Sequence, residues 1–228
     1  MDLTTDPRTN LSPQLYGYAS MHDAITRDCA RLESTLGHLV PGDPSVGARL
    51  VRWFDRFEAV IVHHHGGEDD LVFPLLVERD PSFDPEALTV DHHILDDTME
   101  KLRAGLAALA TDANGAARAH SLRAATDLRT LMADHLDREE AAVFPRMLEF
   151  VSAEEHAEIE LQLRKGLKFS TLTFGLPWIL DEADPDIATH IRADLPFPLL
   201  VLNTLRWDRS YRRLAAPVRD GSNGRANI

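Results

Sequence analysis

Residues 64–74 read HHGGEDDLVFP and residues 135–145 read HLDREEAAVFP, so one pattern of His, Glu and Phe-Pro occurs twice at the same internal spacing. Two further histidines, His22 and His92, are separated by nearly the same offset, and each interrupts a seam of leucines at helical spacing. The chain is therefore predicted to contain two helical hairpins. Each hairpin supplies one histidine from its first helix and a His-x3-Glu pair from its second.

Capping signals predict where these helices begin. Ser12, Asp43 and Asp84 each precede a proline, which is favoured in the first turn of a helix, and Asn114 precedes a glycine. The four predicted helices start at these signals and end near residues 40, 79, 110 and 151. Because short connections join antiparallel neighbours, the predicted fold is all-α, with an antiparallel four-helix bundle over residues 1–151.

Residues 152–228 form a predicted helical extension. Ser152 and Glu155 have capping-box spacing and should open a fifth helix, and the Asp184-Pro185 and Pro198 signals open two more. Between them lies a stretch interrupted by glycine and proline at Gly166, Gly175 and Pro177, with no helix predicted.

The extension is too apolar to be a loose linker. Its large apolar side chains are Trp178, Phe197, Leu199, Leu200 and Trp207. We expect it to pack on the bundle or on a second subunit, which would make the protein a homodimer. The last dozen residues, which end in DGSNGRANI, are expected to be frayed.

Helical periodicity directs six polar side chains to the interior of the bundle. Residues at i and i+4 lie on one helix face, so His64 and Glu68, and likewise His135 and Glu139, can point to a common centre. The complete inward set is His22, His64, Glu68, His92, His135 and Glu139. Burying unpaired carboxylates costs several kcal/mol each, which predicts a bound cation.

The donor types narrow the choice of cation. Calcium prefers oxygen ligands alone, whereas this set mixes imidazole nitrogen and carboxylate oxygen. Carboxylates and imidazoles inside a helical bundle are typical of dinuclear iron and manganese sites. We therefore expect two iron ions, with manganese and zinc as the next candidates.

The motifs His22-Asp23, His64-x3-Glu68, Asp91-His92 and His135-x3-Glu139, in this order over residues 12–151, resemble those of the haemerythrin-like, or HHE cation-binding, domains. The resemblance implies a carboxylate-bridged diiron centre in which Glu68 and Glu139 bridge and the four histidines are terminal ligands. Oxygen-carrying haemerythrins have a fifth histidine four residues along the third helix, where this chain has Asp96. That departure favours a redox enzyme, an oxidase or peroxide-decomposing protein, over simple oxygen carriage.

The same resemblance permits a reduced flavin or deazaflavin as electron donor. An iron or oxygen sensor, a binding module, and a store of iron or oxygen are the alternatives, and the apolar extension motivates the sensor. Stopped-flow oxidation and metal analysis would separate these functions.

Several residues compete with the predicted ligands. His65 with Asp69 is also an i, i+4 pair, and His93 and Glu140 adjoin predicted ligands, but all of them fall off the apolar stripes. The glycines at 66 and 67 either open room for substrate or bend the helix and alter its register. Four more histidines are expected on the surface, namely His38, His120, His156 and His190.

Three side chains near the predicted centre have other predicted roles. Tyr18 lies one turn before His22 and is either a hydrogen bonder, a redox-active phenol or a packing residue. Asp96 is a second candidate for a residue that supports the ligands. Cys29 is expected to be a small core residue rather than a nucleophile.

Composition excludes several other classes. The chain has 24 Lys and Arg against 37 Asp and Glu, a formal charge of −13, so we expect no nucleic-acid or anionic-membrane partner. The N-terminus lacks a signal-peptide pattern and the apolar stretches are too short to span a bilayer. A cytoplasmic location is expected.

Overall fold

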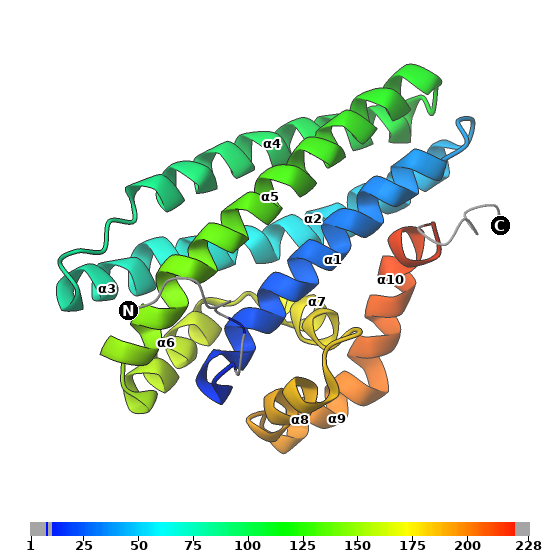
Figure 1. Cartoon of the computed structure of the whole chain (residues 1–228). Helices are drawn as coiled ribbons and strands as arrows, with labels where there is room; N and C mark the ends of the chain where they lie inside the picture. The colour runs from blue at the N-terminus through cyan, green and yellow to red at the C-terminus, as the bar shows by residue number, and fades with distance from the viewer. Residues whose placement is uncertain (1–7, 9–10, 222–228) are drawn as a thin grey trace.

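The computed structural model describes residue 8 and residues 11–221, and every regular element in this part of the chain is helical (Figure 1). The first long helix is α1 (Tyr16–His38), preceded by a short turn, η1 (Pro13–Leu15). Next come α2 (Pro44–Gly67), a wide turn η2 (Glu68–Val72), and α3 (Phe73–Arg79), which form one continuous rod. The remaining bundle helices are α4 (Glu86–Thr111) and α5 (Gly115–Phe150). The predicted all-α bundle is confirmed.

The polar side chains before these helices fix most of the predicted starts. Asp43 accepts a bond from the backbone N–H of Ser45 at 2.9 Å, and Asn114 accepts one from Ala117 at 2.9 Å. These bonds satisfy amides that the first turn of a helix leaves without intrahelical partners. Ser12 differs, since its side chain makes no capping bond and the chain enters α1 through the η1 turn.

The rod formed by α2, η2 and α3 changes its winding where the ligands are expected. In η2 the amide of Phe73 bonds to the carbonyl of Glu68, five residues back, which is π-helical geometry. Such a turn inserts one residue and rotates everything after it on the helix face. Gly66 and Gly67 precede this turn and lie in α2, where the amide of Glu68 still bonds to the carbonyl of His64, so the glycines do not alter the register of the His64 and Glu68 pair.

The extension contains α6 (Ala153–Gly166), α7 (Phe169–Ile179), α8 (Pro185–Ala193), α9 (Phe197–Leu202), η3 (Asn203–Trp207) and α10 (Asp208–Gly221). The capping box of Ser152 and Glu155 opens α6 as predicted. Both α7 and α10 contact α1 and α2, so the extension lies along the seam between these two helices (Figure 1).

Helix α7 was not predicted, because glycine and proline within it are weak helix formers. It forms because its apolar face is buried, with Phe174 3% exposed and Trp178 fully buried in the same core as the bundle. Pro177 lies in the last turn and removes the one hydrogen bond that its N–H would make to the carbonyl of Thr173, a loss that the burial of the apolar face offsets. Tertiary packing here outweighs intrinsic propensity.

The C-terminal prediction is partly wrong. Residues 217–221 continue α10 because Val218 and Gly221 are buried and Thr35 donates to the carbonyl of Val218 at 3.3 Å. Residues 222–228, the rest of the predicted frayed segment, lie outside the described part of the chain. Homodimer formation through the extension stays a prediction, and Phe197, 76% exposed, is available for it.

A network of charges connects the extension to the bundle. Trp178 donates its indole N–H to the buried carboxylate of Asp28 at 2.8 Å, and Tyr211 donates to Asp181 at 2.9 Å. Arg31 contacts both carboxylates, at 2.9 Å from Asp28 and 3.0 Å from Asp181. The extension is therefore held by specific polar contacts as well as by apolar burial.

No helix in the described residues is long and apolar enough to cross a membrane.

Trp178→Ala is expected to lower the free energy of unfolding by about 3 to 5 kcal/mol, because it removes a buried aromatic ring and the indole donor to Oδ2 of Asp28. Phe197→Ala, at an exposed position in the same extension, should change stability by less than about 0.5 kcal/mol. Denaturant unfolding followed by far-UV circular dichroism measures both. Equal stability of the two variants would show that the extension is not part of the bundle core.

Candidate metal centre

Two groups of potential ligands meet in the interior of the bundle. The first group consists of His22 from α1, His64 from α2, Glu68 from η2 and Glu139 from α5. The second consists of His65 from α2, His92 from α4 and His135 from α5. Within each group the donor atoms lie within 4.8 Å of one another. The structure thus brings together all six sequence-predicted ligands and adds His65.

The two carboxylates lie between the groups. Glu68 has Oε1 at 3.0 Å from Nε2 of His64 and Oε2 at 3.5 Å from Nε2 of His92. Glu139 has Oε2 at 3.7 Å from Nε2 of His22 and at 3.4 Å from Nε2 of His135. Each carboxylate therefore faces a histidine of both groups, which is the position required of a bridging ligand.

The interior atoms of this cluster lack the partners that buried polar groups require. Among the described residues, no hydrogen bond reaches either ring nitrogen of His65, Nε2 of His92, Oε2 of Glu68 or Oε2 of Glu139, although all are buried. Leaving such groups unsatisfied costs about 1 to 3 kcal/mol each. Nitrogen and oxygen lone pairs gathered in this way fit transition-metal cations, which would satisfy the two carboxylate oxygens and one nitrogen of each ring.

The protonation states suit metal binding. Burial, followed by the nearby His22 ring, lowers the pKa of His64 to about 3, and burial with the His92 ring lowers the pKa of His65 well below its usual value. Both rings are therefore neutral at pH 7 and have a free lone pair. Burial and the neighbouring Glu139 raise the pKa of Glu68, so without a cation this carboxyl resists ionisation.

His65 is the residue that the sequence reasoning missed. Its ring stacks on that of His92 with centroids 4.1 Å apart and planes within 4°, while His64 faces His22 with the two Nε2 atoms 3.1 Å apart. Adjacent positions on α2 thus serve different groups. The repeat has Leu136 at the position of His65, so duplication could not reveal it; the run of three histidines was the available signal. His63, the third, approaches the carbonyl of Leu163 with Nε2 at 3.1 Å.

Two carboxylates that were set aside as rivals orient the histidines. Nδ1 of His22 lies 2.8 Å from Oε1 of Glu140, and Nδ1 of His92 lies 2.9 Å from Oδ2 of Asp69. Since an ionised carboxylate only accepts, each imidazole donates from Nδ1 and leaves Nε2 as the ligand atom. Arg8 donates to Glu140 from Nε at 2.7 Å and holds it in place.

These orienting contacts cross between the two hairpins. Asp69 directly follows Glu68 in the first hairpin and holds His92 of the second. Glu140 directly follows Glu139 in the second hairpin and holds His22 of the first. The internal repeat therefore includes one residue more than the sequence comparison recognised.

Tyr18 lies against both Glu68 and Glu139. Its hydroxyl is 2.6 Å from Oε1 of Glu68 and also forms a hydrogen bond with Glu139. Burial, together with the charges of these two groups, raises the pKa of Tyr18, so the phenol stays protonated. Of the roles considered, hydrogen bonding and packing are both observed, since the ring also lies against Phe144 with centroids 5.4 Å apart. Asp96 is exposed on α4, and no hydrogen bond or ion pair in the described residues connects it to the ligands.

The surroundings correct two further expectations. His156, predicted on the surface, is only 8% exposed because it lies on α6, a helix that packs on the bundle. Gly67 is on α2, and a Cβ at this position would come within 2.3 Å of Leu163 on α6. This glycine therefore makes room for α6 rather than for substrate. His38, His93 and His120 are exposed, His190 is half-buried beside Tyr16, and Cys29 is in the core as predicted.

An antiparallel helical bundle with a buried cluster of histidines and carboxylates defines a class of metal-binding proteins. The chain belongs to the hemerythrin family: residues 17–147 match the model of the hemerythrin HHE cation binding domain. This result confirms the family resemblance and establishes cation binding as the coarse property of the site.

Two plant proteins are similar to the chain over most of its length. Zinc finger protein BRUTUS of Arabidopsis thaliana is 26% identical over 196 residues, which cover 84% of this chain and 15% of BRUTUS. A BRUTUS-like zinc finger protein of the same plant is 24% identical over 210 residues, which cover 87% of this chain and 16% of the relative. The chain thus spans about a sixth of these relatives. No solved structure matches.

Asp69→Ala and Glu140→Ala are each expected to weaken cation binding about 10- to 100-fold, because they release the ring of His92 or His22 from its ligating orientation. Asp70→Ala, beside Asp69 but exposed and without a described partner, is the matched control and should bind normally. Titration of the metal-free protein with ferrous iron or cobalt measures the affinities. Unchanged affinity in both orienting variants would contradict the assignment.

Proposed function

We propose that the buried cluster holds two iron ions and that the protein is a diiron oxidoreductase acting on dioxygen or peroxide. The observation that supports this most directly is the pair of ligand groups joined by Glu68 and Glu139. One ion would be held by His22 and His64, and the other ion would be held by His65, His92 and His135. Both ions would share the two carboxylates. Iron fits this nitrogen-rich mixed set best, and manganese and zinc follow.

The proposed ligands leave room for an oxygen species. Two histidines and two carboxylates supply four donors to one ion, and three histidines and the same carboxylates supply five to the other. Each ion would therefore have fewer than six protein ligands, which leaves a position for an oxygen species. His65 also restores a fifth imidazole, so the histidine count no longer argues against oxygen carriage. The preference for redox chemistry depends on Tyr18 instead.

Tyr18 is positioned to deliver a proton. Reduction of peroxide to two waters consumes two electrons and two protons, and a bound diiron centre can supply the electrons and polarise the oxygen substrate. The Tyr18 hydroxyl already contacts both shared carboxylates, so it can donate its proton beside the centre and be reprotonated from solvent. A reduced flavin or deazaflavin is the proposed donor class that restores the electrons.

A sensor or binding module is the second candidate. It is favoured by the fact that the similar plant proteins are several times longer than this chain, so domains of this kind also occur within larger proteins. Storage of iron or oxygen is the third. A sensor would bind iron without turning over peroxide, so the activity assays below separate it from the enzyme.

The purified protein is expected to contain about two iron ions per chain after expression in iron-rich medium, since the structure groups seven donors around two points. Glu68→Ala and Glu139→Ala should each abolish the dinuclear site, because each removes one ligand from both ions. His65→Ala should lose one ion, whereas His63→Ala should retain two. Elemental analysis measures the content. One zinc and no iron, or equal loss in both histidine variants, would refute the arrangement.

Tyr18→Phe is expected to retain both iron ions but to lower the rate of peroxide consumption about 100-fold, in the range found for loss of a positioned general acid. Tyr16→Phe, on the same helix but outside the ligand groups, is the control. An oxygen or peroxide electrode with reduced flavin as donor measures the rate. Full activity in Tyr18→Phe would remove the phenol from the mechanism, and absence of turnover in the iron-loaded wild-type protein would favour the sensor.

A further inference from the structure

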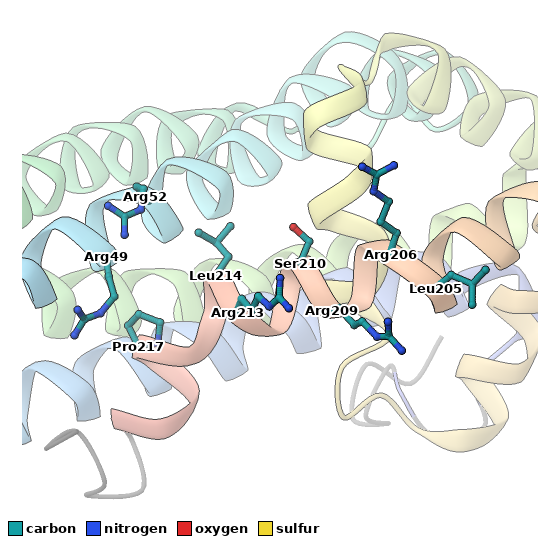
Figure 2. A pocket seen from close by; sticks show the side chains of 9 residues that line it. All are labelled: Arg49, Arg52, Leu205, Arg206, Arg209, Ser210, Arg213, Leu214 and Pro217. Atoms are coloured by element: carbon teal, nitrogen blue, oxygen red, sulfur yellow. The ribbon is translucent and has the colours of Figure 1, made fainter.

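A groove lined by arginines lies on the outside of the molecule, between α2 and the C-terminal helices (Figure 2). It has a volume of about 600 Å³ and is open to solvent on one side. The polar residues that line it are Arg49, Arg52, Arg206, Arg209, Ser210 and Arg213. Leu205, Leu214 and Pro217 supply its apolar surface.

The spacing of these arginines places them on facing stripes. Arg206, Arg209 and Arg213 are three and then four residues apart on η3 and α10, so they share one helix face. Arg49 and Arg52 are three residues apart on α2. Because α10 packs against α2, the two stripes border the same groove.

These arginines lack the acidic partners that their neighbours have. On α10, Arg212 is not among the residues that line the groove and pairs with Asp208 at 2.8 Å, and Arg219 pairs with Asp181. None of the five groove arginines forms an ion pair with a described residue; Arg49 donates only to the hydroxyl of Ser45, at 3.0 Å. Arg49 also interacts electrostatically with the Asp43 carboxylate, whereas no ion pair in the described part of the chain neutralises the other four arginines.

Arg52, Arg206, Arg209 and Arg213 place four positive charges without a described acidic partner along one groove, and Arg49, which interacts with Asp43, adds a fifth. These charges repel one another and focus a positive potential within the groove. A bound anion would relieve this repulsion. Guanidinium groups match phosphate oxygens with paired N–H donors, which makes arginine the preferred residue for phosphate recognition. The groove therefore has the chemistry of a phosphate site in a protein whose overall charge is −13.

The dimensions indicate the kind of ligand. Arg206 and Arg213 are seven residues apart on a helical stretch, about 10 Å along the axis, which exceeds the reach of one phosphate group. A volume of about 600 Å³ is typical of small-molecule sites. We propose that this groove binds a small organic polyphosphate of the nucleoside di- or triphosphate type, with its organic part against Leu205, Leu214 and Pro217.

The groove is separate from the metal centre. Arg52 and His64 are twelve residues apart on α2, which corresponds to about 18 Å along the helix. A polyphosphate in the groove could not contact the iron ligands, so this site is independent of the proposed redox reaction.

Isothermal titration of the iron-loaded full chain with ATP and with inorganic tripolyphosphate, in magnesium-free buffer at low ionic strength, tests the proposal. Both should bind, and adenosine should not. The double variant Arg209→Gln and Arg213→Gln should weaken binding at least tenfold while retaining the wild-type circular dichroism and iron content, because both side chains are exposed. Polyphosphate could also give a signal by removing iron from the metal centre. This signal would be the same in the variant, so it cannot account for a difference in binding between the variant and the wild type.

The double variant Arg123→Gln and Arg192→Gln is the matched control, since it removes two exposed arginines without described ion pairs elsewhere. Its affinity should stay within twofold of wild type. If both double variants bound polyphosphate equally weakly, the loss of affinity would be explained by the change in net charge alone, and the proposal would be overturned. Absence of ATP and tripolyphosphate binding would overturn it as well, as would tighter binding of a single-stranded oligonucleotide that the groove variant abolishes.

Discussion

The burial of Glu68 and Glu139 side by side is the constraint on which the rest of the bundle depends. Two carboxylates in an apolar interior repel each other, and each loses its hydration at a cost of several kcal/mol. The surrounding groups compensate through their orientation, because four imidazoles and the Tyr18 hydroxyl face the two carboxylates. The imidazoles are those of His22, His64, His92 and His135. A cation at each ligand group would convert this unfavourable arrangement into the most stable part of the core.

Each hairpin supplies a carboxylate that orients a histidine of the other hairpin. Asp69 and Glu140 each orient a histidine of the opposite hairpin, so neither half can form its ligand set alone. The symmetry ends at His65, whose equivalent in the second hairpin is Leu136. One ligand group consequently has three histidines and the other has two with the carboxylates close by, which gives two proposed ions unequal environments. Unequal ions suit the binding of an oxygen species at one of them.

The sequence predicted the features that depend on local rules. Caps at Asp43, Asn114 and Ser152 follow from single residues, and the inward position of the six predicted ligands follows from an ideal helical period. The missed features depend on partners distant in sequence. His65 requires a second ligand group formed by α4 and α5, and α7 requires a core to bury Trp178. The burial of His156 likewise depends on α6 packing against the bundle, which its own sequence does not encode.

Sequence similarity to the plant relatives extends beyond the matched domain. Similarity to the plant relatives over 84% and 87% of the chain is longer than residues 17–147, so it includes part of the extension. Helices α7 and α10 cover the seam between α1 and α2, and α2 carries His64 and His65. Helix α2 has Arg49 and Arg52 at one end and the two histidines at the other. Because α10 borders the groove and also packs on this rod, the extension that completes the core also creates the proposed polyphosphate site.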